Sequence, residues 1–435
     1  MKFILRKSIL IFMGLIIMSA SEDIGPLASH CVVTYKNSFY IFGGTIGCST
    51  WASTNFFHYA TPPFSQGKIS WQPLSTTNVK SVTDPGCIVD ESRGLLFVLG
   101  GKDQINSTSP GLQVYDFNTQ IWNDPKYSQY FIPRELINDN WGPRAVWLQP
   151  GLMFMWGANS TTQGSYLLNT NFTPWQWTVL SDNKSYIAPT KDAGVVAIKG
   201  NAFIFGGFHE NDFSINQTQY IYSPKYGFMT PQFQLPTPFN DGVIGVWNNK
   251  LSIIMMDTGG NVMQVVNFDL KTFQFENVIS APFNQNITTT RNRGHGAQFS
   301  WSDSVFIYGG TTGYCSQPIL DTWVVYNMSS QTWNTAFNDI KYTNMISNDL
   351  SLPKVNGLDI NNEDTAVQQS TNTVPQLTSA NREILIIIII ILSSIIVILL
   401  IVFIVIFRRM KRMMNRYKES DIHPMLEKSA TRVVN

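Results

Sequence analysis

The sequence predicts an all-β domain built from repeated four-strand modules, followed by one membrane-spanning helix. Of the 435 residues, 13% are aromatic, only 14% are charged, and 30 Gly and 21 Pro supply turn residues. A β-rich run, which ends in two glycines in four of its six copies, recurs about every 50 to 57 residues. A third feature is an uncharged stretch, 384–407, near the C-terminus. Aromatic and β-branched strands separated by frequent turns are typical of all-β proteins.

The N-terminus has the three parts of a secretory signal peptide. Three basic residues lie within positions 2–7, residues 9–18 are apolar, and small residues occupy positions 19–21. The apolar run is too short to cross a bilayer, which makes an uncleaved anchor the weaker alternative. We therefore expect residues 1–21 to be a signal peptide.

The uncharged stretch 384–407 predicts a transmembrane helix. It is long enough to cross roughly 30 Å of hydrocarbon. A basic cluster that begins with Arg408 and Arg409 follows at once, and the positive-inside rule then places the tail, 408–435, in the cytosol. Residues 336–383 are polar and predict a flexible stalk. The expected topology is a type I single-pass protein of the plasma membrane or of an endomembrane on the secretory or vacuolar route.

Seven glycosylation sequons agree with this orientation, because all of them lie between the signal peptide and the predicted span. Each begins Asn-X-Ser/Thr, the acceptor pattern for N-linked glycans in secreted proteins. The seven acceptors are Asn106, Asn159, Asn171, Asn183, Asn216, Asn286 and Asn327.

The charge distribution argues against nucleic acid as a partner. The whole chain has a formal net charge of +1, but residues 22–383 alone carry −7. Nucleic-acid binding requires a concentrated basic face, which an acidic domain does not supply. The basic tail is expected to touch anionic lipid of the bilayer.

The repeated module is clearest in residues 295–333. It contains Ala297–Trp301, then Val305–Gly310, then Asp321–Asn327, and it closes with Trp333. Short β-rich segments separated by turn residues predict a small antiparallel sheet. The second segment of the six copies falls at Phe39–Gly44, Leu95–Gly101, Leu152–Ala158, Ala202–Gly207, Leu251–Met256 and Val305–Gly310. Copies three and five have no glycine pair at this place, and copy five is the most divergent because Met255, Met256 and Asp257 stand there without any glycine.

This pattern resembles the kelch repeat, whose second strand ends in Gly-Gly and whose fourth strand carries Trp. The fourth-strand aromatics here are Trp71, Trp122, Trp177, Phe228, Phe275 and Trp333. The resemblance covers about Ser29–Thr335, and it implies a six-bladed β-propeller within residues 22–335. Each Trp is expected to fill the wedge between neighbouring blades. Since the first and last copies each contain four segments, no strand exchange is expected at the ring closure.

All four cysteines lie in the predicted ectodomain, which favours disulfides in an oxidising compartment. Cys48 and Cys315 each follow a glycine pair, in copies one and six, and we predict that they form a disulfide that clamps the closed ring. Cys31 and Cys87 are assigned to the same position in adjacent first strands. They either pair with each other or serve as small buried residues.

The sequence contains no clear catalytic constellation. His30 and His295 are assigned to equivalent positions just before the first strand of copies one and six, where a turn-ordering role is favoured over a metal pair. Galactose-oxidase-type copper enzymes share the kelch architecture, so a copper oxidoreductase is the alternative function. However, no matching tyrosine, histidine and cysteine ligand set is found, and no cofactor is predicted.

The remaining interpretation is a recognition module that presents loops from a rigid scaffold. The loops between second and third strands are candidates, namely Thr45–Asn55, Lys102–Pro110 and Phe208–Asn216. Trp51, Phe208 and His209 are the candidate binding residues within them. We expect an extracytosolic protein or glycan as the partner, because exposed aromatic side chains suit both. Packing between blades is the equal alternative for Trp51 and Phe208.

Overall fold

The computed structural model describes the part of the chain that forms the repeated domain. The described residues are 27–46, 52–64, 69–103, 110–123, 142–157, 164–180, 190–207, 219–231, 235–236, 238, 242–256, 263–280, 297–310 and 322–334. All of them belong to one compact unit, Met1–Thr365. Among these residues no helix is long and apolar enough to cross a membrane. The predicted signal peptide, stalk, transmembrane helix and tail lie outside them.

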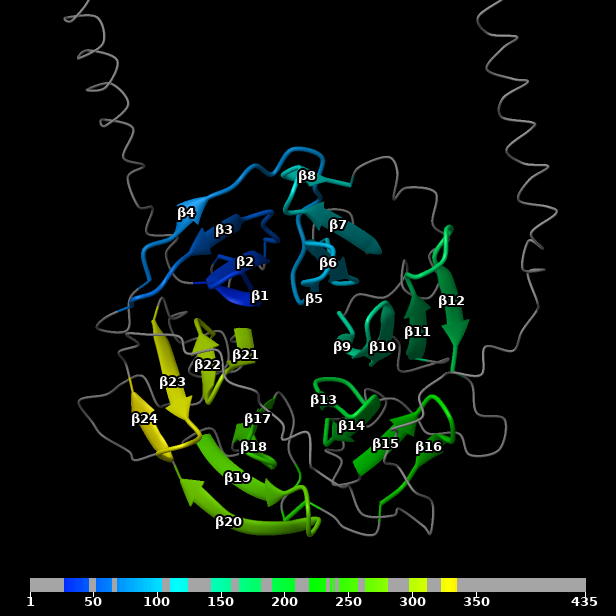
Figure 1. The fold of residues 1–435 in the computed structure, drawn as a ribbon. Coiled ribbons are helices and arrows are strands. Elements are labelled where there is room, and N and C mark those ends of the chain that lie inside the picture. Colours follow the sequence, from blue (N-terminus) through cyan, green and yellow to red (C-terminus); the bar gives the residue numbers. More distant parts are fainter. Residues whose placement is uncertain are drawn as a thin grey trace, which may run out of the picture. The chain divides into compact units, whose positions relative to one another are not determined.

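Six four-stranded antiparallel sheets form the blades of a propeller (Figure 1). Blade one contains β1 (Ala28–Tyr35), β2 (Ser38–Thr45), β3 (Phe57–Ala60) and β4 (Gln72–Pro73). Blade two contains β5 (Gly86–Asp90), β6 (Leu95–Leu99), β7 (Leu112–Asp116) and β8 (Ile121–Trp122). Blade three contains β9 (Arg144–Gln149), β10 (Leu152–Trp156), β11 (Ser165–Asn169) and β12 (Gln176–Val179).

The second half of the ring repeats this arrangement. Blade four contains β13 (Gly194–Ile198), β14 (Asn201–Phe205), β15 (Gln219–Ser223) and β16 (Gly227–Met229). Blade five contains β17 (Val243–Trp247), β18 (Lys250–Met256), β19 (Met263–Asp269) and β20 (Gln274–Ser280). Blade six contains β21 (Ala297–Trp301), β22 (Ser304–Tyr308), β23 (Trp323–Asn327) and β24 (Thr332–Asn334). The predicted six-bladed propeller is confirmed, and the divergent fifth blade is complete.

The first strand of each blade faces the centre of the ring, and the fourth lies at the rim (Figure 1). Each first strand contacts the first strands of both neighbouring blades, and this includes β21 with β1. The ring is therefore closed by side-by-side packing of blades six and one. As expected, no strand is exchanged, because each of the two blades is built from one continuous segment.

A hydrophobic core occupies each of the six interfaces between neighbouring blades. The aromatics predicted for the fourth strands take part in these cores, although Trp71 lies directly before β4. Trp71 and Trp122 are almost fully buried, at 1% and 2% exposure, in the interfaces with the preceding blades. Because one sheet alone cannot bury both of its faces, stacking in a ring is the arrangement that removes them from water.

Two interfaces flank blade one. The closing seam joins blade six to blade one, and the continuous seam joins blade one to blade two. At the closing seam the Gly310 amide donates to the Leu27 carbonyl at 3.0 Å. At the continuous seam the Gly44 amide donates to the Val82 carbonyl at 2.8 Å. The second glycine of the pair thus bonds to the segment that leads into the next blade.

Candidate functional site

The central channel of the propeller is the candidate site. A cavity of about 210 Å³ opens there, and residues of all six first strands or of the segments just before them line it. Most of the lining consists of small side chains and backbone, which leaves few side chains to give the cavity its chemistry. Those few are His30, Arg144 and Ser300, together with Cys31 and Cys87.

The cavity and the predicted binding loops belong to the same face of the propeller. Strands alternate in direction within each blade, so first strands begin, second strands end and third strands begin on one face. The cavity includes the starts of β5, β9 and β13. The loops that follow β2, β6 and β14 therefore leave the sheets on the cavity face.

The bases of two of these loops are connected. Ser53 Oγ lies 3.3 Å from Asp103 Oδ1, which joins the loop after β2 to the loop after β6. A backbone bridge between Thr54 and Val82 anchors the first loop to the lead of blade two. The predicted binding residues Trp51, Phe208 and His209 lie outside the described residues, so their roles stay predictions.

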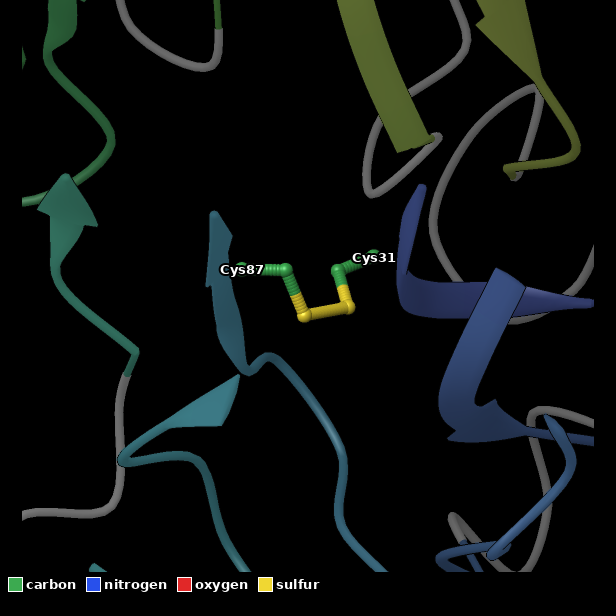
Figure 2. Close-up of a disulfide and its surroundings, with 2 residues drawn as sticks. All are labelled: Cys31 and Cys87. Atoms are coloured by element: carbon green, nitrogen blue, oxygen red, sulfur yellow. A yellow bond between two sulfur atoms is a disulfide. The ribbon is translucent and has the colours of Figure 1, made fainter. Parts of the chain in front are cut away.

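Cys31 of β1 and Cys87 of β5 form a disulfide beside the cavity (Figure 2). Their Cα atoms are 5.9 Å apart. Of the two alternatives left open by the sequence, pairing is confirmed. The predicted Cys48–Cys315 disulfide lies outside the described residues.

The prediction that Cys31 and Cys87 occupy the same strand position is wrong by one residue. Cys31 pairs with Phe42, directly before the glycine pair of its blade, whereas Cys87 pairs with Val98, one residue earlier relative to Gly100. The reason is geometric. Two stacked blades meet through opposite faces of their sheets, and side chains alternate between faces along a strand. A disulfide across the interface therefore joins two first-strand positions that, counted from the glycine pair of each blade, differ by an odd number of residues.

His30 lies inside β1, where the prediction placed it just before the first strand. The difference arises because β1 begins at Ala28 and extends along blade six. The His30 ring makes an edge contact with Tyr308 of blade six, with ring centroids 5.6 Å apart. Burial lowers the pKa of His30 to about 3, with a backbone hydrogen bond to Ala28 as a smaller opposing effect. His30 is consequently neutral near pH 7.

No group of three or more His, Cys, Asp or Glu side chains within the described ranges is placed to hold a metal ion. His295, the predicted partner of His30 in the alternative metal pair, lies outside those ranges. His30 itself packs against the neighbouring blade through Tyr308.

Arg144 is the one residue with a permanently charged side chain among the described residues that line the cavity. Its guanidinium lies 3.9 Å from the Asp192 carboxylate, and both side chains are partly exposed, at 39% and 30%. A guanidinium can bind a carboxylate or phosphate through two parallel hydrogen bonds. Arg144 therefore gives the cavity a place to hold an anionic group.

Arg144 is absent from the residues predicted from the sequence, because the third module was expected to begin at Ala145. The register of strand pairing shows how Arg144 could have been identified. Arg144 pairs with Trp156, the residue before the glycine of its blade, and the equivalent first-strand residues of four other blades are small. These are Cys31, Gly86, Gly194 and Ala297. A single arginine among small residues at one repeat position marks a departure from the repeat.

Comparisons with known proteins do not assign a family. No protein-family model matches the chain, and no curated protein matches it. One solved structure, "Structure of YjhT", is similar at 12% sequence identity with a TM-score of 0.48. The match covers 72% of this chain and 98% of that one.

Proposed function

We propose that the chain is a membrane-anchored, extracytosolic propeller of the kelch type that recognises a protein or glycan partner through its cavity face. The observation that carries this proposal is the position of Arg144. It is the one charged cavity residue in the described part of the chain, and it is partly exposed on the face from which the predicted binding loops leave. We infer that it binds an anionic group of the partner.

The disulfide supports the extracytosolic part of the proposal. Disulfides persist in oxidising compartments and are rare in the cytosol. Cys31–Cys87 joins two strands of the same domain that carries the predicted sequons. The signal peptide at 1–21 and the span at 384–407 supply the corresponding sequence predictions.

Proximity labelling on intact cells that express the full chain tests the proposal. The wild type is compared with Arg144→Ala and with a matched control, Lys271→Ala. Lys271 is an exposed cation on the turn between β19 and β20, on the face opposite the cavity. We expect the wild type and Lys271→Ala to label the same partners from the extracellular or luminal side.

Arg144→Ala should reduce recovery of these partners about tenfold or more, because a charge-assisted hydrogen bond contributes about 1.5–3 kcal/mol. Equal labelling by all three proteins would refute the role of Arg144. Labelling confined to cytosolic proteins by a reporter fused to the N-terminal end of the propeller would refute the topology.

A further inference from the structure

The turn between the third and fourth strands has the same internal hydrogen bond in five blades. The last residue of the third strand accepts a hydrogen bond from a backbone N–H two or three residues later. The five accepting side chains belong to Asp116, Asn169, Ser223, Asp269 and Asn327. Short polar side chains favour such turns because they replace a backbone acceptor. We call this residue the turn cap.

Two of the predicted glycosylation sequons fall on this turn, but at different places. Asn327 is itself the turn cap of blade six. Asn171 lies two residues beyond the turn cap of blade three, Asn169, and donates its backbone N–H to that cap at 3.1 Å. The two sequons thus form a natural comparison, with the same turn and the same acceptor pattern but different positions.

Both the oxygen and the nitrogen of the Asn327 side-chain amide make hydrogen bonds within the fold. Its Oδ1 accepts from the Ser330 backbone N–H at 2.8 Å and from the Ser329 hydroxyl at 2.7 Å. Its Nδ2 donates to Asp303 Oδ2 at 2.9 Å. Because the amide is planar, the contacts of Oδ1 hold Nδ2 against Asp303. Asn327 is also half-buried, so a glycan on Nδ2 would have to fit beside this carboxylate within the hydrogen-bonded turn.

The Asn171 side chain lies over Gly151, but the turn that carries it is exposed. Asn171, Phe172 and Thr173, the whole sequon, are exposed. The Nδ2 of Asn171 donates to the Pro150 carbonyl at 3.1 Å, which uses one of its two amide hydrogens. The second hydrogen remains for substitution, and a sugar attached there would extend from an exposed turn.

We propose that Asn171 carries an N-linked glycan and that Asn327, despite the same sequon, remains unmodified as a turn cap. In the reaction, the Asn171 Nδ2 forms a bond to C1 of an oligosaccharide supplied on a lipid pyrophosphate. The bond between C1 and the phosphate oxygen breaks, the lipid pyrophosphate leaves, and Nδ2 loses one proton. The proposal rests on the extracytosolic location proposed above.

The position of this glycan is compatible with recognition through the cavity. Third strands end on the face opposite the one on which first strands begin. A glycan on the turn after β11 therefore lies on the face away from Arg144 and leaves the cavity face uncovered.

Peptide mapping of the wild-type full chain, expressed in a eukaryotic secretory host, tests the proposal. Enzymatic removal of N-glycans in ¹⁸O-water labels each formerly occupied Asn. We expect label on Asn171 and none on Asn327. Thr173→Ala, which destroys the first sequon, should remove one glycan by intact mass, whereas Ser329→Ala, which destroys the second, should leave the glycan number unchanged.

An unlabelled Asn171 in a chain with glycans at other sequons would overturn this inference and leave the extracytosolic location intact. A labelled Asn327 in folded protein would also overturn it. Absence of glycans at every sequon would overturn it together with the location. The wild-type measurement requires no variant to fold.

Discussion

The two seams that flank blade one differ in how the chain connects their blades, but the contacts across them are similar. The continuous seam joins blades that follow each other in sequence, whereas the closing seam joins the first blade to the last. In both, a Trp that lies in the fourth strand or directly before it donates its indole N–H into the preceding blade. Trp122 donates to the Ser75 carbonyl at 3.1 Å, and Trp71 donates to the Tyr308 hydroxyl at 3.1 Å. Closure therefore repeats the contacts of an ordinary interface.

The seams differ in what reinforces them near the channel. The continuous seam has the Cys31–Cys87 disulfide, and the closing seam has the contact of His30 with Tyr308. Noncovalent packing of the described residues thus joins blade six to blade one, while a covalent bond is placed between blades that the chain already connects. Substitutions at each seam can separate these contributions.

The largest effect is expected from Gly309→Ala at the closing seam. A Cβ there would lie 2.3 Å from the Leu27 carbonyl oxygen, and the residue has a φ of +68°. Backbone strain and overlap together should lower the free energy of unfolding by about 3 kcal/mol, measured by urea denaturation with tryptophan fluorescence.

Gly227→Ala is the control, because Gly227 has a φ of +74° and no atom within 4 Å of its Cβ position. It should cost about 1 kcal/mol. Equal losses would show that close approach at the seam is unimportant.

Removal of the disulfide should have an effect of similar size. The double variant Cys31→Ser, Cys87→Ser opens a link between residues 56 apart in sequence. We expect a loss of about 2–4 kcal/mol in the same denaturation measurement, because the cross-link restricts the unfolded chain. Reduction of the wild type should reproduce this loss and should leave the double variant unchanged. Unchanged stability of the double variant would mean that noncovalent contacts are sufficient at the continuous seam.

Acid should weaken the closing seam through His30. Its folded pKa lies near 3, below the ordinary value of 6.5, so the unfolded chain binds more protons between these pH values. Stability therefore falls as pH decreases through this window, by about 2 kcal/mol from His30 between pH 7 and pH 5. Denaturation at both pH values should show a smaller decrease for His30→Gln than for the wild type. The same decrease in both proteins would exclude His30 as its source.

The smallest effect is expected from Tyr308→Phe. This substitution removes the acceptor of the buried Trp71 indole N–H and leaves the ring in place. The expected loss is about 1–2 kcal/mol, from the unsatisfied donor. With Trp71→Phe in the background, Tyr308→Phe should cost less, and the double-mutant cycle measures the coupling. Additive losses would show that the hydrogen bond does not stabilise the closing seam.

Much of the fold could be predicted because its determinants are local and repeated. The segment Ala297–Trp301 was predicted with the bounds of β21, and the position of Trp333 in a fourth strand is confirmed. Blade five shows the limit of motif recognition. It has no glycine pair directly at the end of β18, yet β18 pairs with β19 along seven residues. Apolar residues on both faces of that sheet, Leu251 and Ile253 toward blade four and Ile254 toward blade six, maintain it where the motif is absent.

The candidate site was less predictable, because its residues come together only when the ring closes. The sequence alone determined the number of modules, the strands of each and the aromatic residues of their outer strands, since hydrophobic period and turn residues act within a few positions. Tertiary structure decided which cysteines bond, why they differ by one register position, and that Arg144 faces the cavity. These properties depend on which sheet faces meet across a seam, and only the stacking of complete blades determines that.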